Sequence, residues 1–282
     1  DLYISGNLKE TEIKCRDILS KYPKSAEVLN ILGAVLISKK LFDEALDSFI
    51  LAIEINPNFL EAHNNLGNTF LELRRLEEAI KSYDKALLIN PAFVEAQNNR
   101  GNALLKFGKL EEAIQNYKKA ISINPSFFQA YNNLGNALLK FEKIEEAIEN
   151  YKKAISINPN FVEAYNNYGS ALMKKNLYEQ AIINFKKSID INPNFSNTYY
   201  NYGKALNELG LLKEAISFYK KAIKINPFYF KAHSNLLLLY NYIDDFDLEF
   251  KFKEACNFGT IVKKTINKIF TNHECAFVTK KL

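Results

Sequence analysis

The feature that most constrains this chain is a repeat of 34 residues that runs through most of its 282 residues. An Asn-Pro dipeptide recurs at this step, with its proline at Pro57, Pro91, Pro125, Pro159, Pro193 and Pro227. Glycine keeps the same step at Gly33, Gly67, Gly101, Gly135, Gly169 and Gly203. So does an alanine followed four residues later by Phe or Tyr, from Ala45 with Phe49 to Ala215 with Tyr219. Columns that stay in register over six units indicate a stack of identical supersecondary units.

Each column has a physical reason, which the unit FQAYNNLGNALLKFEKIEEAIENYKKAISINPNF (128–161) shows most clearly. Its first half carries apolar residues at helical spacing, namely Tyr131, Leu134, Leu138 and Phe141. Its second half has a stripe of its own, Ile148, Tyr151 and Ile155. The small residues Gly135 and Ala147 let the two helices approach closely. Asn158-Pro159 ends the second helix, because proline has no N–H and disfavours the α conformation in the residue before it.

These residues resemble the tetratricopeptide repeat. The resemblance implies an all-α, right-handed superhelical solenoid of antiparallel helix pairs, in which first helices line a concave groove and second helices face outward. Six full repeats cover 26–229. Residues 1–25 are read as the second helix of a partial leading repeat, and 230–242 as the first helix of a seventh, with Leu237 where glycine is expected. Residues 243–282 are predicted to be irregular or partly helical, with a helix around 248–258 and a possible role as a bridge to a missing domain.

Asparagines form three columns in the first helices, opposite the apolar stripe. The first column is Asn65, Asn99, Asn133, Asn167, Asn201 and Asn235, with Ile31 in the first repeat. The second column is Asn64, Asn98, Asn132 and Asn166. The third column is Asn68, Asn102 and Asn136. Four glutamates, Glu27, Glu61, Glu95 and Glu163, line the edge.

Two explanations of these columns stand side by side. One is a solvated helix face in a chain rich in asparagine; the other is a face that meets a ligand. Asparagine lowers helix stability by roughly half a kcal/mol relative to alanine, and the second helices fill their solvated faces with Lys and Glu instead. The ligand-facing explanation is therefore favoured, and replacing these residues with alanine is expected not to lower stability. Carboxamides both donate and accept, so they suit the backbone of extended or disordered segments of other proteins. The asparagine before each proline needs only turn chemistry.

The first column, together with first helices of the NNLGNALL type, looks like the repeat region of O-GlcNAc transferase-like glycosyltransferases, including the plant SPINDLY group. In that family an asparagine ladder holds the backbone of protein substrates, which the resemblance carries to the first column here. The exit AHSNLLLLYNYIDDFDLEFKFKEACNFG resembles the family's bridge to its glycosyltransferase domain. No sugar-nucleotide residue can be assigned, so the alternative is a stand-alone adaptor that assembles protein complexes.

Other functions find little support in the sequence. We find no nucleophile with a base, no phosphate loop and no paired carboxylates, so no catalytic residue, cofactor or metal is predicted, and His63 and His233 are read as packed histidines. His273 and Cys275 lack further metal ligands. The lysine pairs from Lys118-Lys119 to Lys220-Lys221 alternate with Glu on second helices, and the net charge of +5 is mild, so nucleic acid is not expected as a partner.

No apolar run in the sequence is long enough to span a membrane. Three scattered cysteines and the absence of a signal peptide predict a cytoplasmic location, in a chain read as cut from something longer. Nothing predicts an oligomeric state.

Overall fold

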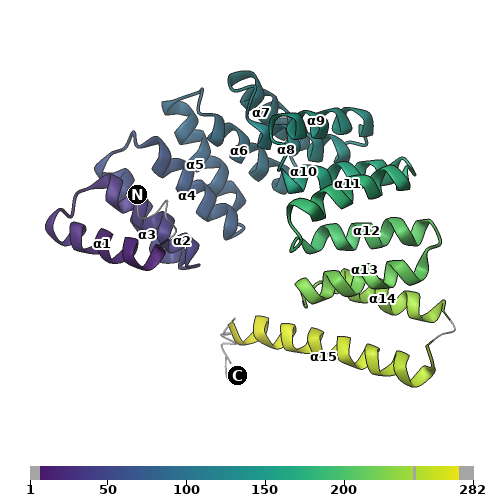
Figure 1. Ribbon diagram of the computed structural model, residues 1–282. Helices are drawn as coiled ribbons and strands as arrows, with labels where there is room; N and C mark the ends of the chain where they lie inside the picture. The colour runs from purple at the N-terminus through teal and green to yellow at the C-terminus, as the bar shows by residue number, and fades with distance from the viewer. Residues whose placement is uncertain (1–6, 244–245, 273–282) are drawn as a thin grey trace, which may run out of the picture. The chain divides into compact units, whose positions relative to one another are not determined.

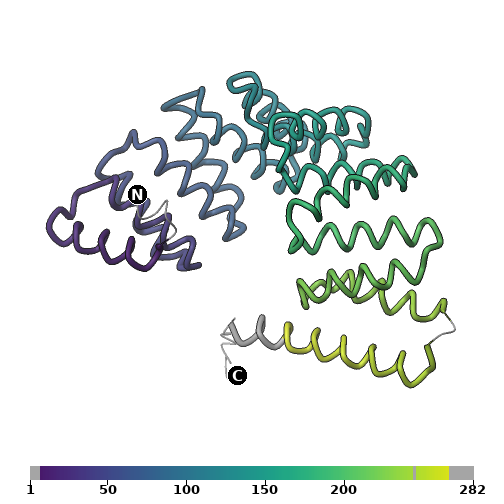
Figure 2. The backbone as a smooth tube through the Cα atoms, in the orientation of Figure 1, coloured from purple at the N-terminus to yellow at the C-terminus, as the bar shows by residue number. Residues whose placement is uncertain are grey.

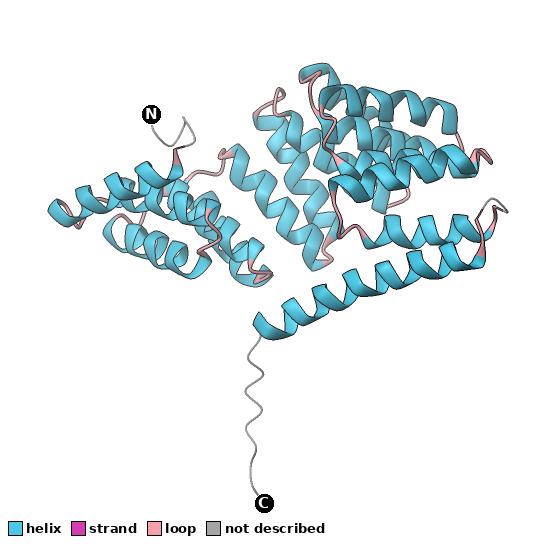
Figure 3. Cartoon of the chain, turned by 60° about the horizontal axis from the view of Figure 1, so that its bottom comes forward, coloured by secondary structure: helices cyan, strands magenta, loops and turns pink. Residues whose placement is uncertain are grey.

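The computed structural model describes residues 7–243 and 246–272, which form fifteen α-helices and no strand (Figures 1 and 3). The helices are α1 (Leu8–Lys21), α2 (Ala26–Ser38), α3 (Phe42–Ile55), α4 (Leu60–Glu72), α5 (Leu76–Ile89), α6 (Val94–Phe107), α7 (Leu110–Ile123), α8 (Phe128–Lys140), α9 (Ile144–Ile157), α10 (Val162–Lys174), α11 (Tyr178–Ile191), α12 (Ser196–Glu208), α13 (Leu212–Ile225), α14 (Phe230–Asn241) and α15 (Leu248–Asn272).

The chain divides into two units, Asp1–Ile157 and Asn158–Leu282. In the first unit, α1 is followed by the antiparallel pairs α2/α3, α4/α5, α6/α7 and α8/α9, which the backbone trace follows in sequence (Figure 2). The second unit has the pairs α10/α11 and α12/α13, then α14 and α15. Within each unit, every pair packs on the next one along the chain. The prediction of an all-α solenoid of helix pairs is confirmed.

In each of the six full repeats, an Asn-Pro dipeptide ends the second helix in the same way. Asn56 leaves the helical conformation at φ −129° and ψ 91°, as the residue before a proline must. Its side-chain Oδ1 then accepts the backbone N–H of Asn58 at 3.2 Å. The equivalent asparagines accept from Ala92, Ser126, Asn160, Asn194 and Phe228 at 2.9–3.1 Å. These asparagines therefore serve the turn, as the sequence predicts.

The turn between the two helices of a pair depends on a residue in the left-handed conformation. Such residues recur every 34 positions, at Lys40, Arg74, Gly108, Glu142, Asn176 and Gly210, with φ between 58° and 90°. A left-handed conformation is unfavourable for residues with a Cβ, and only two of the six positions are glycine. The fold therefore imposes the left-handed backbone conformation on the four residues of this set that are not glycine.

The core of each repeat is a glycine on the first helix against an aromatic ring on the second. A Cβ built on Gly135 would lie 2.6 Å from Cε1 of Tyr151, and the other five repeat glycines meet their aromatic rings at 2.5–2.8 Å. The rings of Tyr83, Tyr117 and Tyr151 are fully buried. The close contact predicted for Gly135 is confirmed, and the column is glycine because no other residue fits.

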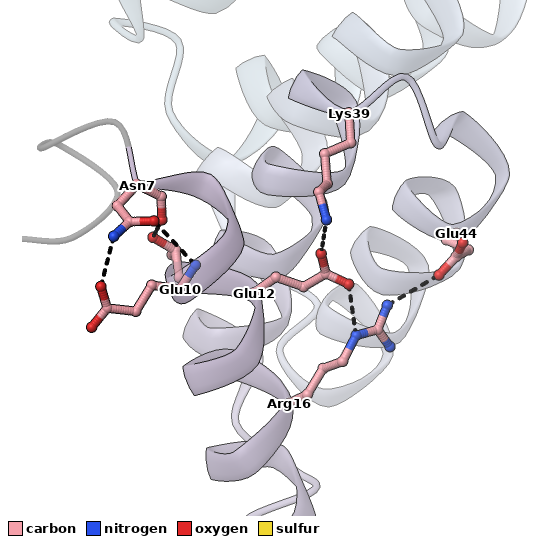
Figure 4. A network of polar contacts seen from close by, with 7 residues as sticks. Asn7, Glu10, Glu12, Arg16, Lys39 and Glu44 are labelled. Atoms are coloured by element: carbon pink, nitrogen blue, oxygen red, sulfur yellow. Dashed lines mark hydrogen bonds and ion pairs between the residues drawn. The ribbon is translucent and has the colours of Figure 1, made fainter.

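Helix α1 is fastened to the first full repeat by charged side chains (Figure 4). Glu12 bonds Lys39, at the end of α2, and Nε of Arg16 at 2.9 Å. Arg16 also reaches Glu44 on α3 at 3.1 Å. The hydrogen bonds from Lys39 and Arg16 hold the pKa of Glu12 below its usual value. The network joins three helices around a carboxylate whose side chain is only 15% exposed.

The end of the chain departs from the repeat. Helix α15 extends well beyond the stretch 248–258 predicted as helical, to Asn272, and packs on α14. Its Phe258 stacks on His233 at 4.9 Å, while Tyr240 packs against Phe246 and Phe250. Leu237, at the position where the full repeats have glycine, lies on α14 and is half-buried. His273 and Cys275 lie outside the described residues. None of the described helices has the length and apolar character needed to cross a membrane.

Candidate functional site

The second asparagine column lies inside the stack. Asn64, Asn98, Asn132 and Asn166 are only 5–7% exposed. A carboxamide at this depth has almost no surface for a ligand, and burying it is unfavourable unless its polar atoms are hydrogen-bonded. The expectation that these four residues face a peptide is therefore not supported by their burial. Their place is between successive first helices.

The first column hydrogen-bonds to the second across successive repeats. Nδ2 of Asn65, Asn99, Asn133 and Asn201 donates to Oδ1 of the asparagine 35 residues earlier, at 2.9–3.1 Å. These acceptors are Asn30, Asn64, Asn98 and Asn166. All six first-column residues, Asn167 and Asn235 included, are half-buried. Asn65, Asn99, Asn133 and Asn201 therefore present part of the amide to the surface while joining the repeats, so these positions are structural as well as accessible.

Two neighbouring amides extend this pattern into a chain of hydrogen bonds. Asn98 donates from Nδ2 to Oδ1 of Asn99 at 3.3 Å, and Asn166 does the same to Asn167 at 3.4 Å. In the first unit the bonds run from Asn133 through Asn98 and Asn99 to Asn64. These bonds argue against the expectation that alanine is harmless at the first column, because removing a first-column amide would leave a buried oxygen without a donor.

The third column is bonded to the aromatic residue of its own repeat. The hydroxyl groups of Tyr83, Tyr117 and Tyr151 donate to Oδ1 of Asn68, Asn102 and Asn136, each at 2.8 Å. Burial raises the pKa of all three phenols far above neutrality, so each keeps its proton. The third-column amides are half-buried. The sequence pointed to these asparagines but not to the tyrosines that bond them, although asparagine and tyrosine are 15 residues apart in each of the three repeats.

A cleft of about 460 Å³ opens beside two of these columns in the first unit. Asn65 and Asn68 line it from α4, with Ala34 from α2 and Lys40 from the turn. Residues three apart on a helix share a face, so the first and third columns face the same space. The edge glutamates are exposed, and so are the lysine pairs of the second helices.

The remaining candidates have structural partners. His63, only 9% exposed, lies 2.9 Å from the carbonyl oxygen of Pro57, and His233 contacts that of Pro227 at 3.0 Å. Gln97 donates to the carbonyl of Pro91 in the equivalent place. The part of the chain that the structure describes holds no cluster of three metal-binding side chains.

Family profiles identify the repeats. Tetratricopeptide repeat profiles match residues 26–59, 60–93, 82–115, 128–161, 150–183 and 196–229, and a TPR repeat profile matches 101–140 and 169–210. Together these matches cover 26–229 without a gap. The chain belongs to the tetratricopeptide repeat family. No curated protein sequence matches it.

Solved tetratricopeptide repeat structures are similar to this chain. The structure described as the APC/C hetero-tetramer Cut9-Hcn1 has a TM-score of 0.75 at 18% identity, covering 84% of this chain and 47% of that one, and so shows the fold alone. MamA has a TM-score of 0.50 at 30% identity, covering 57% of this chain and 95% of that one. YrrB, described as "a TPR protein with an unusual peptide-binding site", has a TM-score of 0.50 at 25% identity, covering 67% of this chain and 98% of that one.

The tetratricopeptide repeats at the two ends of the columns differ from the rest. Sequence reasoning missed Asn30, which stands 34 residues before Asn64 and accepts from Asn65. In the last full repeat Tyr200 occupies the second column, and Asn235 donates instead to the hydroxyl of Tyr219 at 3.3 Å. Tyr200 packs on Tyr219 and Tyr229, at 5.9 and 5.0 Å between ring centres. The amide surface is therefore most complete in the first unit.

Proposed function

We propose that this tetratricopeptide repeat scaffold binds extended or disordered segments of other proteins through the amides of its first helices. The observation that carries the proposal is the cleft in the first unit, where Asn65 and Asn68 present half-buried carboxamides side by side. An extended peptide offers an N–H and a C=O at every residue, and a carboxamide can pair with both. The peptide-binding site named in the description of YrrB supports the same class of ligand.

Nδ2 of Asn65, Asn99, Asn133 and Asn201 already donates between repeats, so the group that a first-column residue can offer a peptide is its Oδ1. The Oδ1 atoms of Asn65 and Asn133 accept no hydrogen bond from any described residue, so they are open to a peptide N–H. At a net 0.5–1.5 kcal/mol for each hydrogen bond, a few such contacts give micromolar or weaker binding after the peptide is ordered. Because backbone groups are shared by all peptides, the sequence preference is loose.

The test compares the amide face with the charged outer face. One variant replaces Asn65, Asn99 and Asn133 with alanine, and its matched control replaces Lys118, Lys152 and Lys186 with glutamine. Binding is screened on an array of unstructured random-sequence peptides, and the strongest binder is measured by fluorescence anisotropy. Circular dichroism checks that each variant is folded at the assay temperature.

We expect the asparagine variant to lose roughly 1–3 kcal/mol of binding free energy, the contribution of the two open acceptors on Asn65 and Asn133, and the lysine variant to bind as the parent does. Binding should change little with salt, since no phosphate-type charge contacts are involved. Binding by the asparagine variant equal to that of the parent, or no peptide bound by the parent at all, would overturn the proposal.

A narrower candidate is that this region recognises substrates for an O-GlcNAc transferase-like enzyme. The first column and the exit segment, which resemble that family, favour it over a stand-alone adaptor. The two candidates differ in what the complete gene encodes beyond this sequence. A glycosyltransferase domain after the repeats would support the enzyme, and any other continuation would favour the adaptor.

A further inference from the structure

Three repeats of the first unit share a pair that no other repeat has. We call Tyr83, Tyr117 and Tyr151 the locking tyrosines; they are fully buried, and each donates its hydroxyl proton to the third-column asparagine 15 residues earlier. The hydroxyl reaches from the second helix through the repeat to the first. The pair therefore connects the core of each repeat to its surface.

The sequence contains its own control for this pair. Where the second-helix aromatic is Phe49 or Phe185, which have no hydroxyl group, the residue 15 positions earlier is Ala34 or Ser170 rather than asparagine. Tyr219 has Lys204 at that position, and its hydroxyl accepts from Asn235. Asparagine in the third column thus occurs only opposite a tyrosine whose hydroxyl it accepts. A solvated or composition-driven column would have no reason to follow the hydroxyl.

The hydrogen bond fixes the direction of the third-column amide. Its Oδ1 is held by a phenol that cannot lose its proton near neutral pH, so the Nδ2 group must point the other way. Nδ2 of Asn68, Asn102 and Asn136 donates to no side chain or backbone atom of the described residues. Each of these half-exposed amides is therefore a fixed pair of donors.

Donor and acceptor stand together in the cleft. Asn68 presents Nδ2 there, while Asn65, with its Nδ2 engaged by Asn30, presents Oδ1. An acceptor and a donor one helical turn apart are complementary to the N–H and C=O of a peptide backbone. Successive first helices pack about 8–10 Å apart, which corresponds to about three residues of an extended chain at roughly 3.3 Å per residue.

We propose that the locking tyrosines are positioning residues, which hold the third-column amides as donors for about every third carbonyl oxygen of a bound extended peptide. This inference rests on the proposed function and assigns a direction to each contact. The tyrosines do not touch the ligand. They act by preventing the amide from turning its oxygen toward a carbonyl that it would repel.

The experiment uses two variants of the whole chain, one with three substitutions and one with six. The lock variant carries Tyr83→Phe, Tyr117→Phe and Tyr151→Phe. The pair variant adds Asn68→Ala, Asn102→Ala and Asn136→Ala, which reproduces in three repeats the Phe49 and Ala34 combination of the first. Both should fold, because phenylalanine already occupies this place in two repeats. The probe is the peptide selected from the random-sequence array.

We expect the pair variant to bind this peptide at least about tenfold more weakly than the parent, and the lock variant to lose most of the same affinity although it keeps every asparagine. A third variant, with Asn68→Ala, Asn102→Ala and Asn136→Ala alone, should bind as weakly as the pair variant, which a merely structural role of the hydroxyl groups would not explain. As a gain-of-function test, Ala34→Asn with Phe49→Tyr should strengthen binding more than Ala34→Asn alone.

The failures of the two proposals are distinguishable. A lock variant that binds like the parent, while the pair variant is weak, overturns the positioning role and leaves the peptide site standing. A pair variant that binds like the parent, while the first-column variant is weak, overturns the third column as a donor set. If all three variants bind like the parent, the proposed function itself is wrong.

Discussion

Replacing Asn133 with alanine should destabilise this protein, although alanine is the better helix former. Nδ2 of Asn133 donates to Oδ1 of Asn98 at 2.9 Å, and Asn98 is only 5% exposed. Alanine contributes about 0.5 kcal/mol through helix propensity. The orphaned oxygen of Asn98 costs about 1–3 kcal/mol, so the net loss should be about 0.5–2.5 kcal/mol.

The free energy of unfolding is measured by urea titration with far-UV circular dichroism. Since long repeat arrays can unfold in parts, amide hydrogen exchange in α6 and α8 serves as the local readout. Asn197→Ala, at an exposed first-helix position, is the matched control and should stay within about 0.5 kcal/mol of the parent. Removing both partners, with Asn98→Ala and Asn133→Ala together, should recover part of the loss. An Asn133→Ala protein as stable as the parent would refute this reasoning, because propensity would then outweigh the bond between repeats.

Three further predictions concern other parts of the chain. Gly135→Ala should lower stability by about 1–3 kcal/mol, because its Cβ would stand 2.6 Å from the ring of Tyr151; an unchanged melting temperature contradicts the packing. Since the pKa of Glu12 is lower in the folded protein than its usual 4.5, the stability it contributes is complete above that value and is lost as pH falls through the folded pKa. The protection of the α1 amides, that is, their exchange relative to the intrinsic rate at each pH, should therefore fall in acid, and Glu12→Gln should remove that pH dependence. Calorimetry should detect no saturable binding of UDP-GlcNAc to this chain, and a saturable isotherm would make an enzyme the leading candidate.

The helix pairs were predictable because their causes are local and repeat. Each Asn-Pro dipeptide ends a helix by backbone chemistry alone, and the close contact between Gly135 and Tyr151 follows from a small and a large residue in register. The left-handed turn residues were harder to see, because Glu142 and Asn176 occupy positions where only Gly108 and Gly210 signal the conformation.

The asparagine columns could be found from the sequence, but their separate roles could not. Helical periodicity places residues 64 and 65 on neighbouring lines of one helix, and only the packing of the preceding first helix decides which of them is buried. The pairing of Asn102 with Tyr117 also joins two helices, although its 15-residue spacing in three repeats is visible in the sequence. The packing of α15 on α14 follows no repeated pattern, so periodicity gave no sign of it.

The 35-residue step of the asparagine bonds makes a repeat that carries both columns, such as the one with Asn98 and Asn99, self-complementary. A middle repeat donates one amide N–H to the repeat before it, as Asn99 does, and offers one amide oxygen to the repeat after it, as Asn98 does. A duplicated repeat inserted in frame would therefore find a matching asparagine on both sides. After the deletion of one repeat, its two neighbours could still form the asparagine hydrogen bond with each other. Such an array can change in length by whole repeats without losing the hydrogen bonds between them.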